Sequence, residues 1–227
     1  MKKNKLIVMV LCIVVCLTAC NKSEPILNFS TLRFINLIPD DTSGINISMS
    51  STSFQSGLPY GTATPFRFVD SSLNLLSVAH EGGFRLDSAL TVARRSIYTC
   101  FLVNAVSSMN LLIVEETEET TDPRISRFRI AQLSPDAPAL DIYYKGGSKI
   151  LSDVQFKDIS DVINLSSPVD SVFLDVRLAG TATTVLSPRI ALGKGMIHTI
   201  YLKGFYHPNI IYPANIFSAD KVSYKLF

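Results

Sequence analysis

Apolar and polar residues alternate along much of the chain after about residue 30, and this period of two predicts β-strands. In one such run, Leu140, Ile142 and Tyr144 fall on the same side of a strand. Clusters of glycine, proline, aspartate and serine separate the strand-sized runs. No segment keeps apolar residues at helical spacing for three turns, so long helices are not expected. The sequence therefore predicts an all-β fold of antiparallel sheets, each with one buried and one solvated face.

The strand pattern occurs twice along the chain. Arg33 aligns with Arg129 at an offset of 96 residues, and Ile97–Leu102 aligns with Ile197–Leu202 at an offset of 100 residues. The shared order of the aligned segments predicts an internal duplication. Each copy has the length of a sandwich of about seven strands. We therefore predict two tandem β-sandwiches, over residues 31–114 and 125–227, separated by an acidic linker over residues 115–124.

The pattern of the first 20 residues predicts an N-terminal signal that targets the protein to a membrane. Three lysines precede the apolar run Leu6–Leu17, which is too short to span a bilayer comfortably. The run leads into Leu17-Thr18-Ala19-Cys20, which resembles the lipobox of bacterial lipoproteins. The resemblance implies a signal peptide over residues 1–19, acyl chains such as palmitate on Cys20, and a tether over residues 20–30. An ordinary secretory signal and an uncleaved anchor are the alternatives.

Lipidation of Cys20 implies a membrane as one partner, because several acyl chains give stable anchoring. The next residue, Asn21, differs from the aspartate that retains some inner-membrane lipoproteins. This favours the outer membrane over the inner membrane. We therefore expect a bacterial cell-envelope protein, either periplasmic or exposed on the cell surface.

Removal of the signal peptide changes both the charge and the cysteine count. The mature chain keeps 18 basic and 19 acidic residues, so it lacks the excess positive charge that attracts nucleic acid. Cys12 and Cys16 leave with the signal and Cys20 takes lipid, which leaves Cys100 without an intramolecular partner. Because Cys100 lies in the strand-like run Ile97–Val103, we predict a buried, unreactive thiol.

A proline-containing corner follows the first strand of each copy. In the second copy, Pro135 sets φ for a turn, and Pro138 ends one strand ladder before the next strand begins. Ser134 and Asp136 are expected to accept backbone N–H bonds at this corner. A ligand role for Asp136 or Asp141 is the alternative. The predicted structural corner residues are Ser134, Pro135, Asp136 and Pro138, with Pro39 and Asp40 in the first copy.

Four motifs of the second copy carry a resemblance to a known family. They are SPDAP at Ser134–Pro138, LDIY at Leu140–Tyr143, the segment Phe156–Leu165, and GKGMIHT at Gly193–Thr199. Over Ser126 to about Gly204, the chain closely resembles the bacterial domain-of-unknown-function family numbered 4397. The first copy is a degenerate member, because Ile38 replaces Ser134 and the second proline is lost. The family implies immunoglobulin-like sandwiches in cell-envelope proteins, with no established activity.

Catalytic and metal-binding motifs do not stand out in the sequence. None of His80, His198 and His207 belongs to an HExxH or HxH pair, which leaves zinc without support. His198 is expected to be half-buried by packing on a strand face shared with Ile200, with Thr199 on the opposite face. His80 precedes the predicted turn Glu81-Gly82-Gly83 and is expected to be exposed, and His207 falls in another predicted turn. We predict no catalytic residue, no metal and no cofactor.

Two residue sets are scattered in sequence and could converge only in the fold. One is a set of loop and strand carboxylates, and the other is a set of aromatics that could form a stacking platform for a sugar or a partner, although tryptophan is absent. We predict a non-catalytic module that binds protein or glycan in the envelope. A hydrolase or hydrolase accessory with an unrecognised site and a structural spacer are the alternatives. The sets are Asp153, Asp158, Asp161, Asp170 and Asp175, and Tyr143, Phe173, Tyr201, Phe205, Tyr206 and Tyr212.

Overall fold

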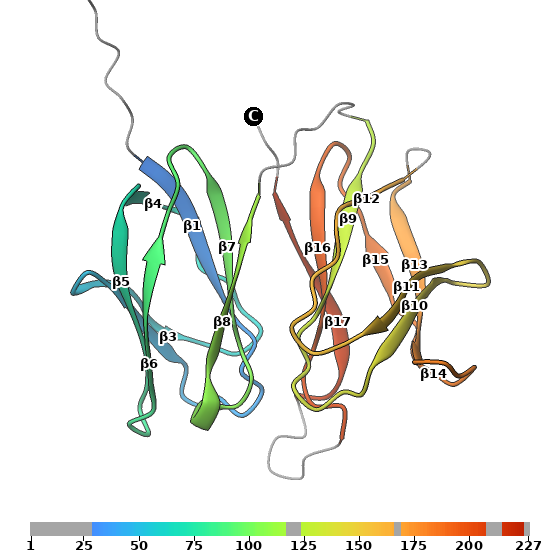
Figure 1. The fold of residues 1–227 in the computed structure, drawn as a ribbon, viewed down its shortest axis with the longest axis horizontal. Coiled ribbons are helices and arrows are strands. Elements are labelled where there is room, and N and C mark those ends of the chain that lie inside the picture. The colour runs from blue at the N-terminus through green and yellow to red at the C-terminus, as the bar shows by residue number, and fades with distance from the viewer. Residues whose placement is uncertain (1–28, 117–123, 166–168, 208–214, 225–227) are drawn as a thin grey trace, which may run out of the picture.

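The computed structural model describes residues 29–116, 124–165, 169–207 and 215–224, which form two β-sandwiches side by side (Figure 1). In the first sandwich, one sheet has the order β4 (Arg67–Asp70), β1 (Phe29–Asn36), β7 (Ile97–Val103), β8 (Asn110–Glu115). The other sheet has the order β3 (Thr52–Leu58), β2 (Ile45–Met49), β5 (Leu73–His80), β6 (Arg85–Thr91). A short 3-10 helix, η1 (Val106–Ser108), follows β7. Within these described ranges, no helix is long and apolar enough to cross a membrane.

The second sandwich has equivalent strands in the same order. One sheet has the order β12 (Ile163–Asn164), β9 (Arg127–Gln132), β16 (Ile197–Lys203), β17 (Ser218–Tyr224). The other sheet has the order β11 (Lys149–Val154), β10 (Leu140–Tyr144), β13 (Ser171–Leu178), β14 (Thr184–Leu186), and β15 (Arg189–Ala191) also pairs with β13. The all-β prediction and the sandwich architecture are confirmed.

One strand pair in each sandwich is parallel, which differs from the predicted antiparallel sheets. β1 runs parallel to β7, with Thr31 opposite Ile97, and β9 runs parallel to β16, with Arg127 opposite Ile197. Parallel neighbours need a long connection, and in each case the chain passes through the opposite sheet between the two strands. A period of two assigns a residue to a face, but it does not specify the direction of the neighbouring strand.

Each sandwich has its own apolar core between its two sheets. In the first core, Phe34 of β1 packs edge-on against Phe54 of β3, with ring centroids 5.1 Å apart. In the second core, Leu140 and Ile142 of β10 are fully buried, as the alternation along this strand predicted. Full burial of one such side chain stabilises the fold by about 1.5–3 kcal/mol. The burial of apolar side chains between the sheets therefore holds each sandwich together.

A third apolar cluster joins the two sandwiches. The sheet of β1, β7 and β8 faces the sheet of β9, β16 and β17 through side chains that point away from both cores. Phe101 of β7 and Tyr201 of β16, which hold equivalent positions, meet edge-to-face with ring centroids 5.8 Å apart. The other fully or nearly buried members of this interface cluster are Ile35, Leu37, Val103, Val114, Ala131 and Leu133.

The interface cluster corrects the expectation that each sheet has one solvated face. Thr199 of β16 is 0% exposed, because the other sandwich covers the face of the sheet on which Thr199 lies. His198 on the opposite face is also fully buried, and not half-buried as predicted. Alternation in sequence cannot distinguish a sheet face that is open to solvent from one that a second sheet covers. In either case the pattern places Thr199 and Lys203 on the face away from the core.

Polar residues form a buried chain at one end of the interface. Arg33 Nε donates to Thr99 Oγ1 at 3.1 Å, and that hydroxyl donates to Glu116 Oε1 at 2.8 Å. Arg129 Nη2 donates to Glu116 Oε2 at 2.8 Å and to the Tyr224 hydroxyl at 3.2 Å. Burial raises the pKa of Glu116, and the neighbouring Arg129, Thr99 and Arg33 oppose that rise. Burial also lowers the pKa of Arg33 to about 10.

Glu116 also corrects the start of the predicted linker. Glu115 is the last residue of β8, and Glu116 is 2% exposed. The first two residues of the acidic run, Glu115 and Glu116, are therefore part of the folded first sandwich. Residues 117–123 of the predicted linker lie outside the described residues.

Cys100 lies in the first core and is 0% exposed, which confirms the predicted burial. Burial raises the pKa of its thiol to about 12, so the reactive thiolate is scarce at neutral pH. We expect a chain that starts at Asn21 to resist maleimide labelling in its native state and to label once in denaturant. Prompt labelling of the native protein would show that this core opens readily.

Candidate binding site

The corner of the second sandwich ties two loops together. β9 ends at Gln132, Pro135 and Asp136 form a turn, and β10 begins at Leu140. Asp136 Oδ1 accepts a hydrogen bond from the backbone N–H of Tyr206 at 2.7 Å, and Oδ2 accepts one from the N–H of His207 at 2.9 Å. The carboxylate therefore fastens the corner to the loop after β16.

Ser134 has a different role at this corner from the predicted acceptor role. Its hydroxyl donates to the carbonyl of Gly204 at 2.6 Å, in the same loop after β16 that Asp136 holds. Pro138 is exposed and lies two residues before β10. Asp141, the alternative ligand residue, is nearly fully buried and accepts bonds from Lys149 Nζ at 2.7 Å and from Asp153 N at 3.0 Å.

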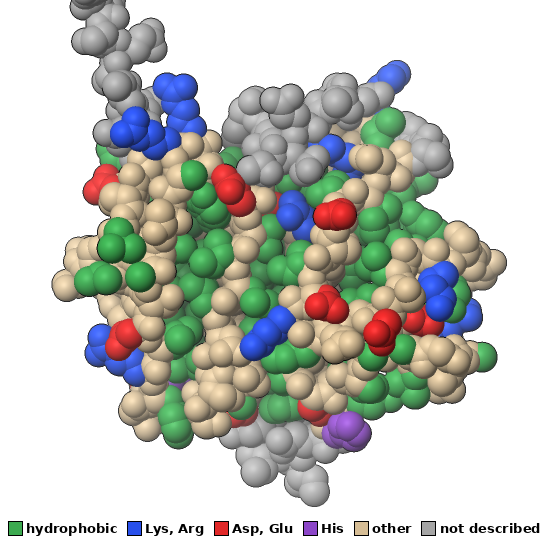
Figure 2. All heavy atoms as spheres, in the orientation of Figure 1, with side chains coloured by type: hydrophobic (Ala, Val, Ile, Leu, Met, Phe, Trp, Pro, Cys, Tyr) green, Lys and Arg blue, Asp and Glu red, His purple; other side chains and the backbone are tan. Residues whose placement is uncertain are grey.

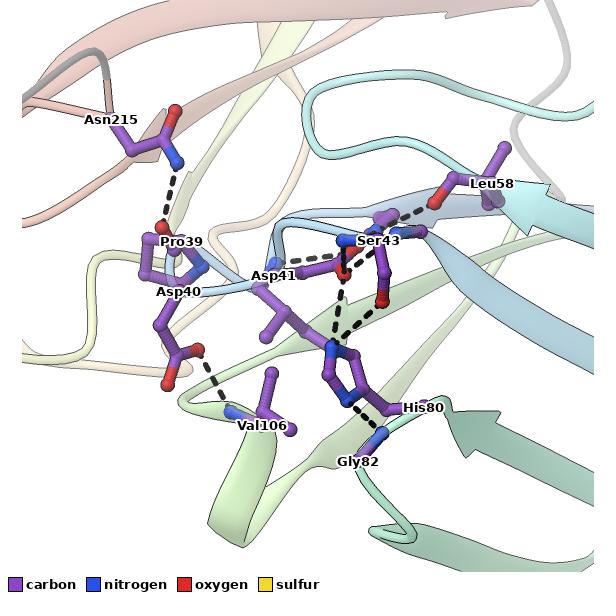
Figure 3. Close-up of polar contacts among 12 residues, drawn as sticks. Pro39, Asp40, Asp41, Ser43, Leu58, His80, Gly82, Val106 and Asn215 are labelled. Atoms are coloured by element: carbon purple, nitrogen blue, oxygen red, sulfur yellow. Dashed lines mark hydrogen bonds and ion pairs between the residues drawn. The ribbon is translucent and has the colours of Figure 1, made fainter. Parts of the chain in front are cut away.

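The first sandwich repeats this arrangement at Pro39 and Asp40 (Figure 3). Asp40 Oδ1 accepts a bond from the N–H of Val106, at the start of η1 after β7, at 2.8 Å. Asn215 of the second sandwich donates its side-chain N–H to the carbonyl of Pro39 at 2.7 Å. The equivalent carboxylates Asp40 and Asp136 thus both brace the loop that follows the parallel strand, and Pro39 also contacts the other sandwich.

A serine, a histidine and an aspartate lie together beside this corner (Figure 3). His80 Nε2 lies 3.1 Å from Ser43 Oγ and 3.5 Å from Asp41 Oδ1. His80 Nδ1 accepts a hydrogen bond from the N–H of Gly82 at 2.9 Å, so the neutral ring carries its proton on Nε2. Nucleophilic catalysis needs serine and aspartate on opposite ring nitrogens. Here both face Nε2, so the cluster braces a loop and has no general base for Ser43.

His80, which was predicted to be exposed, is mostly covered, whereas His207 is exposed. The side chain of His80 is 14% exposed and that of His207 is 75% exposed. His80 is covered because its ring packs into the loop that Asp41 organises. The buried Asp41 carboxylate accepts bonds from Gly44 N at 2.8 Å and from Asn36 Nδ2 at 2.6 Å.

The two scattered residue sets do not converge in the part of the chain that the structure describes. Tyr201 is buried in the interface cluster, Tyr206 packs against Phe217, and Tyr212 lies outside the described residues. No group of three or more His, Cys, Asp or Glu in the described segments could hold a metal ion. The six aromatics therefore do not form a single exposed platform.

An open hollow of about 460 Å³ lies on the outer face of the first sandwich, over β2, β5 and β6. Leu75, 64% exposed, forms an apolar wall, and Ser48 and Ser77 line the floor from adjacent strands. Arg85 Nε lies 2.7 Å from Asp87 Oδ1 on the opposite wall. Bonds from Arg85 and Ser77 hold the pKa of Asp87 below its usual range, so this wall presents an ionised carboxylate.

Small residues create this hollow, as the second sandwich shows. Strand pairing places Tyr143 where the first sandwich has Ser48, and Arg189 where it has Ala89. Arg177 stacks over the ring of Tyr143 at 4.2 Å, and Arg189 lies over Phe173 at 5.6 Å. These larger side chains occupy the space that stays open as a hollow in the first sandwich. Sequence analysis missed the hollow, because Ser48 and Ala89 are neighbours only through the strand pairing.

The fold and this site define an all-β, two-sandwich protein with an open hollow on one outer face. The chain belongs to the family described as "Domain of unknown function (DUF4397)", whose sequence profile matches residues 30–143. The match is a single copy that spans the first sandwich and ends in β10, whereas the motifs identified in sequence lie mainly in the second sandwich. No curated protein matches the chain.

Among solved structures, the chain is similar to a carbohydrate-binding module, CBMbc of family CBM26 from Eubacterium rectale Amy13K, crystallised in complex with maltoheptaose. The two chains are 13% identical, and the alignment covers 88% of this chain and 97% of that chain with a TM-score of 0.27. A similarity of this extent carries no information about the ligand of this protein.

Proposed function

We propose that this protein is a lipid-anchored component of the bacterial cell envelope that binds a partner protein and catalyses no reaction. The lipobox-like sequence ending at Cys20 supports the anchor, and Asn21 supports the outer membrane as its location, on the periplasmic or the cell-surface side. The orientation of Ser43 and Asp41 on the same nitrogen of His80 supports a non-catalytic role.

The open hollow of the first sandwich is the observation that carries the binding proposal. It combines one apolar wall, hydroxyl groups on its floor and an ion pair, and these groups suit a polypeptide surface. β6, which forms one side of the hollow, is the edge strand of its sheet. An edge strand of seven residues presents unpaired backbone groups to which a partner strand can add.

Filling the hollow with residues of the second sandwich tests this function. A chain that starts at Asn21 is used as bait for solubilised envelope, alongside the variant Ser48→Tyr/Ala89→Arg and the control Phe173→Ser, which changes the same face of the other sandwich. We expect the filled variant to lose about 90% or more of the partner that the parent retains, since hot-spot contacts dominate binding. The control should retain it. Equal capture by the filled variant would disprove the hollow as the binding site.

Glycan binding is the second candidate function, and the outer face of the second sandwich favours it. Phe173 is 48% exposed there, with Arg189 over its ring. An exposed aromatic side chain offers a stacking surface for a sugar ring. In the same bait experiment, loss of a bound glycan from the Phe173→Ser variant alone would support this second candidate.

A further inference from the structure

The end of the first sandwich at which the chain enters carries three exposed apolar side chains. Phe29 of β1 is 46% exposed, Phe68 of β4 is 79% exposed and Leu73 of β5 is 61% exposed. The rings of Phe29 and Phe68 lie edge-to-face with centroids 6.5 Å apart. All three border a hollow of about 470 Å³ that Met49 and Phe54 also line. We call these three residues the apolar end.

The second sandwich has polar residues at two of these three positions. Phe68 lies opposite Thr31, and the equivalent residue opposite Arg127 is Asn164. Leu73 lies opposite Thr91, and the equivalent residue of β13 is Ser171. The same sheet positions are therefore compatible with polar side chains. Large exposed apolar residues at adjoining positions mark contact surfaces, so the difference indicates a contact that the first sandwich alone makes.

Two arginines are held beside the apolar end. Arg94 and Arg95 form the exposed turn before β7, and the N–H of Arg95 donates to the carbonyl of Phe29 at 3.1 Å. Arg95 has φ +58°, a left-handed conformation that the second sandwich gives to Gly195 at φ +63°. An arginine in this conformation is disfavoured. Figure 2 shows Lys and Arg side chains gathered at the end of the first sandwich where β1 begins.

The position of the tether brings this end close to a membrane. Eight residues lie between Cys20 and Phe29, so even a fully extended tether spans only about 30 Å. We propose that the apolar end inserts into the headgroup region of the lipid bilayer, with Arg94 and Arg95 against lipid phosphates. This inference rests on the lipid anchor of the proposed function. Aromatic side chains with neighbouring arginines suit this boundary, and the hollow over β2, β5 and β6 is then held at a defined angle to the membrane.

The absence of tryptophan from the chain provides a direct test. In a chain that starts at Asn21 and carries no lipid, Phe68→Trp places a single tryptophan at the apolar end. Phe84→Trp places one in the turn at the other end of β5, where Phe84 is 46% exposed. With vesicles of phosphatidylethanolamine and phosphatidylglycerol, we expect a blue shift of emission for Phe68→Trp and none for Phe84→Trp. Equal shifts for both variants, or none for either, would overturn the proposal.

A second variant separates membrane contact from other causes. Phe68→Asn/Leu73→Ser carries the residues of the second sandwich, so it is expected to keep its unfolding midpoint and to bind these vesicles about tenfold more weakly in sedimentation. Unchanged vesicle binding would disprove the role of the apolar end. A blue shift of Phe68→Trp with solubilised envelope protein, and none with vesicles, would assign the surface to a protein partner instead. Because the tested chain lacks the lipid, failure of the anchor is measured separately, by release of full-length Cys20→Ala from cell membranes.

Discussion

Replacement of Glu116 by glutamine is expected to lower the free energy of unfolding by about 3–5 kcal/mol, the range for breaking a buried ion pair. Glu116 is 2% exposed and accepts bonds from Thr99 and from Arg129. Without its carboxylate, the Arg129 guanidinium would remain buried without a counter-charge. Arg33 would also lose the nearby negative charge that favours its protonated form. Urea titration of the chain that starts at Asn21 would measure the loss.

Asp87→Asn is the matched control for Glu116→Gln, because it makes the same chemical change in an ion pair on the surface. The Arg85 and Asp87 side chains are 60% and 61% exposed, and solvent screens such pairs. We expect no measurable change in the unfolding midpoint of this variant. An equally small effect of Glu116→Gln would mean that the buried chain of polar residues contributes little to the association of the two sandwiches.

Replacement of Phe101 by alanine is expected to destabilise the protein by about 3–5 kcal/mol through the cavity that it leaves. Phe101 is fully buried in the interface cluster and contacts Tyr201 of the other sandwich. Because each sandwich covers the outer face of the other, we expect the parent chain to unfold in one transition. Calorimetry would measure both the midpoint and the number of transitions.

Phe173→Ala is the control for Phe101→Ala, because it removes an aromatic ring from an outer face that is open to solvent. Phe173 is 48% exposed, so its loss leaves no internal cavity. We expect its midpoint to change far less than that of Phe101→Ala. Two separate transitions in the parent chain, with only the first sandwich affected by Phe101→Ala, would show that the sandwiches are energetically independent.

The strands and corners were predictable because their signals are local. Alternation along Leu140–Tyr144 places Leu140 and Ile142 in a core regardless of which strands pair. Pro39 and Pro135 restrict the backbone directly, and both lie in turns where the sequence placed them. The burial of Cys100 followed from the same alternating pattern.

The interface and the hollow could not be predicted, because both depend on residues brought together by strand pairing and by the packing of two sheets. Thr199 and Glu116 have the character of solvated residues, and they are buried only because a second sandwich covers them. Ser48 and Ala89 line one hollow only because β2 and β6 pair on either side of β5. The hydroxyl of Ser134 was assigned as an acceptor because its partner, the carbonyl of Gly204, lies 70 residues away.

The spacing of residues along the chain was enough to predict strands and a repeated pattern, both of which the structure contains, and it also predicts an N-terminal membrane-targeting signal. These properties arise from the spacing of neighbouring residues, which the unfolded chain already possesses. Which outer faces are covered and which remain open follows only from the packing of the two sandwiches. That choice depends on the free energy of bringing two whole sheets into contact, and no single strand contains the residues that contribute to it.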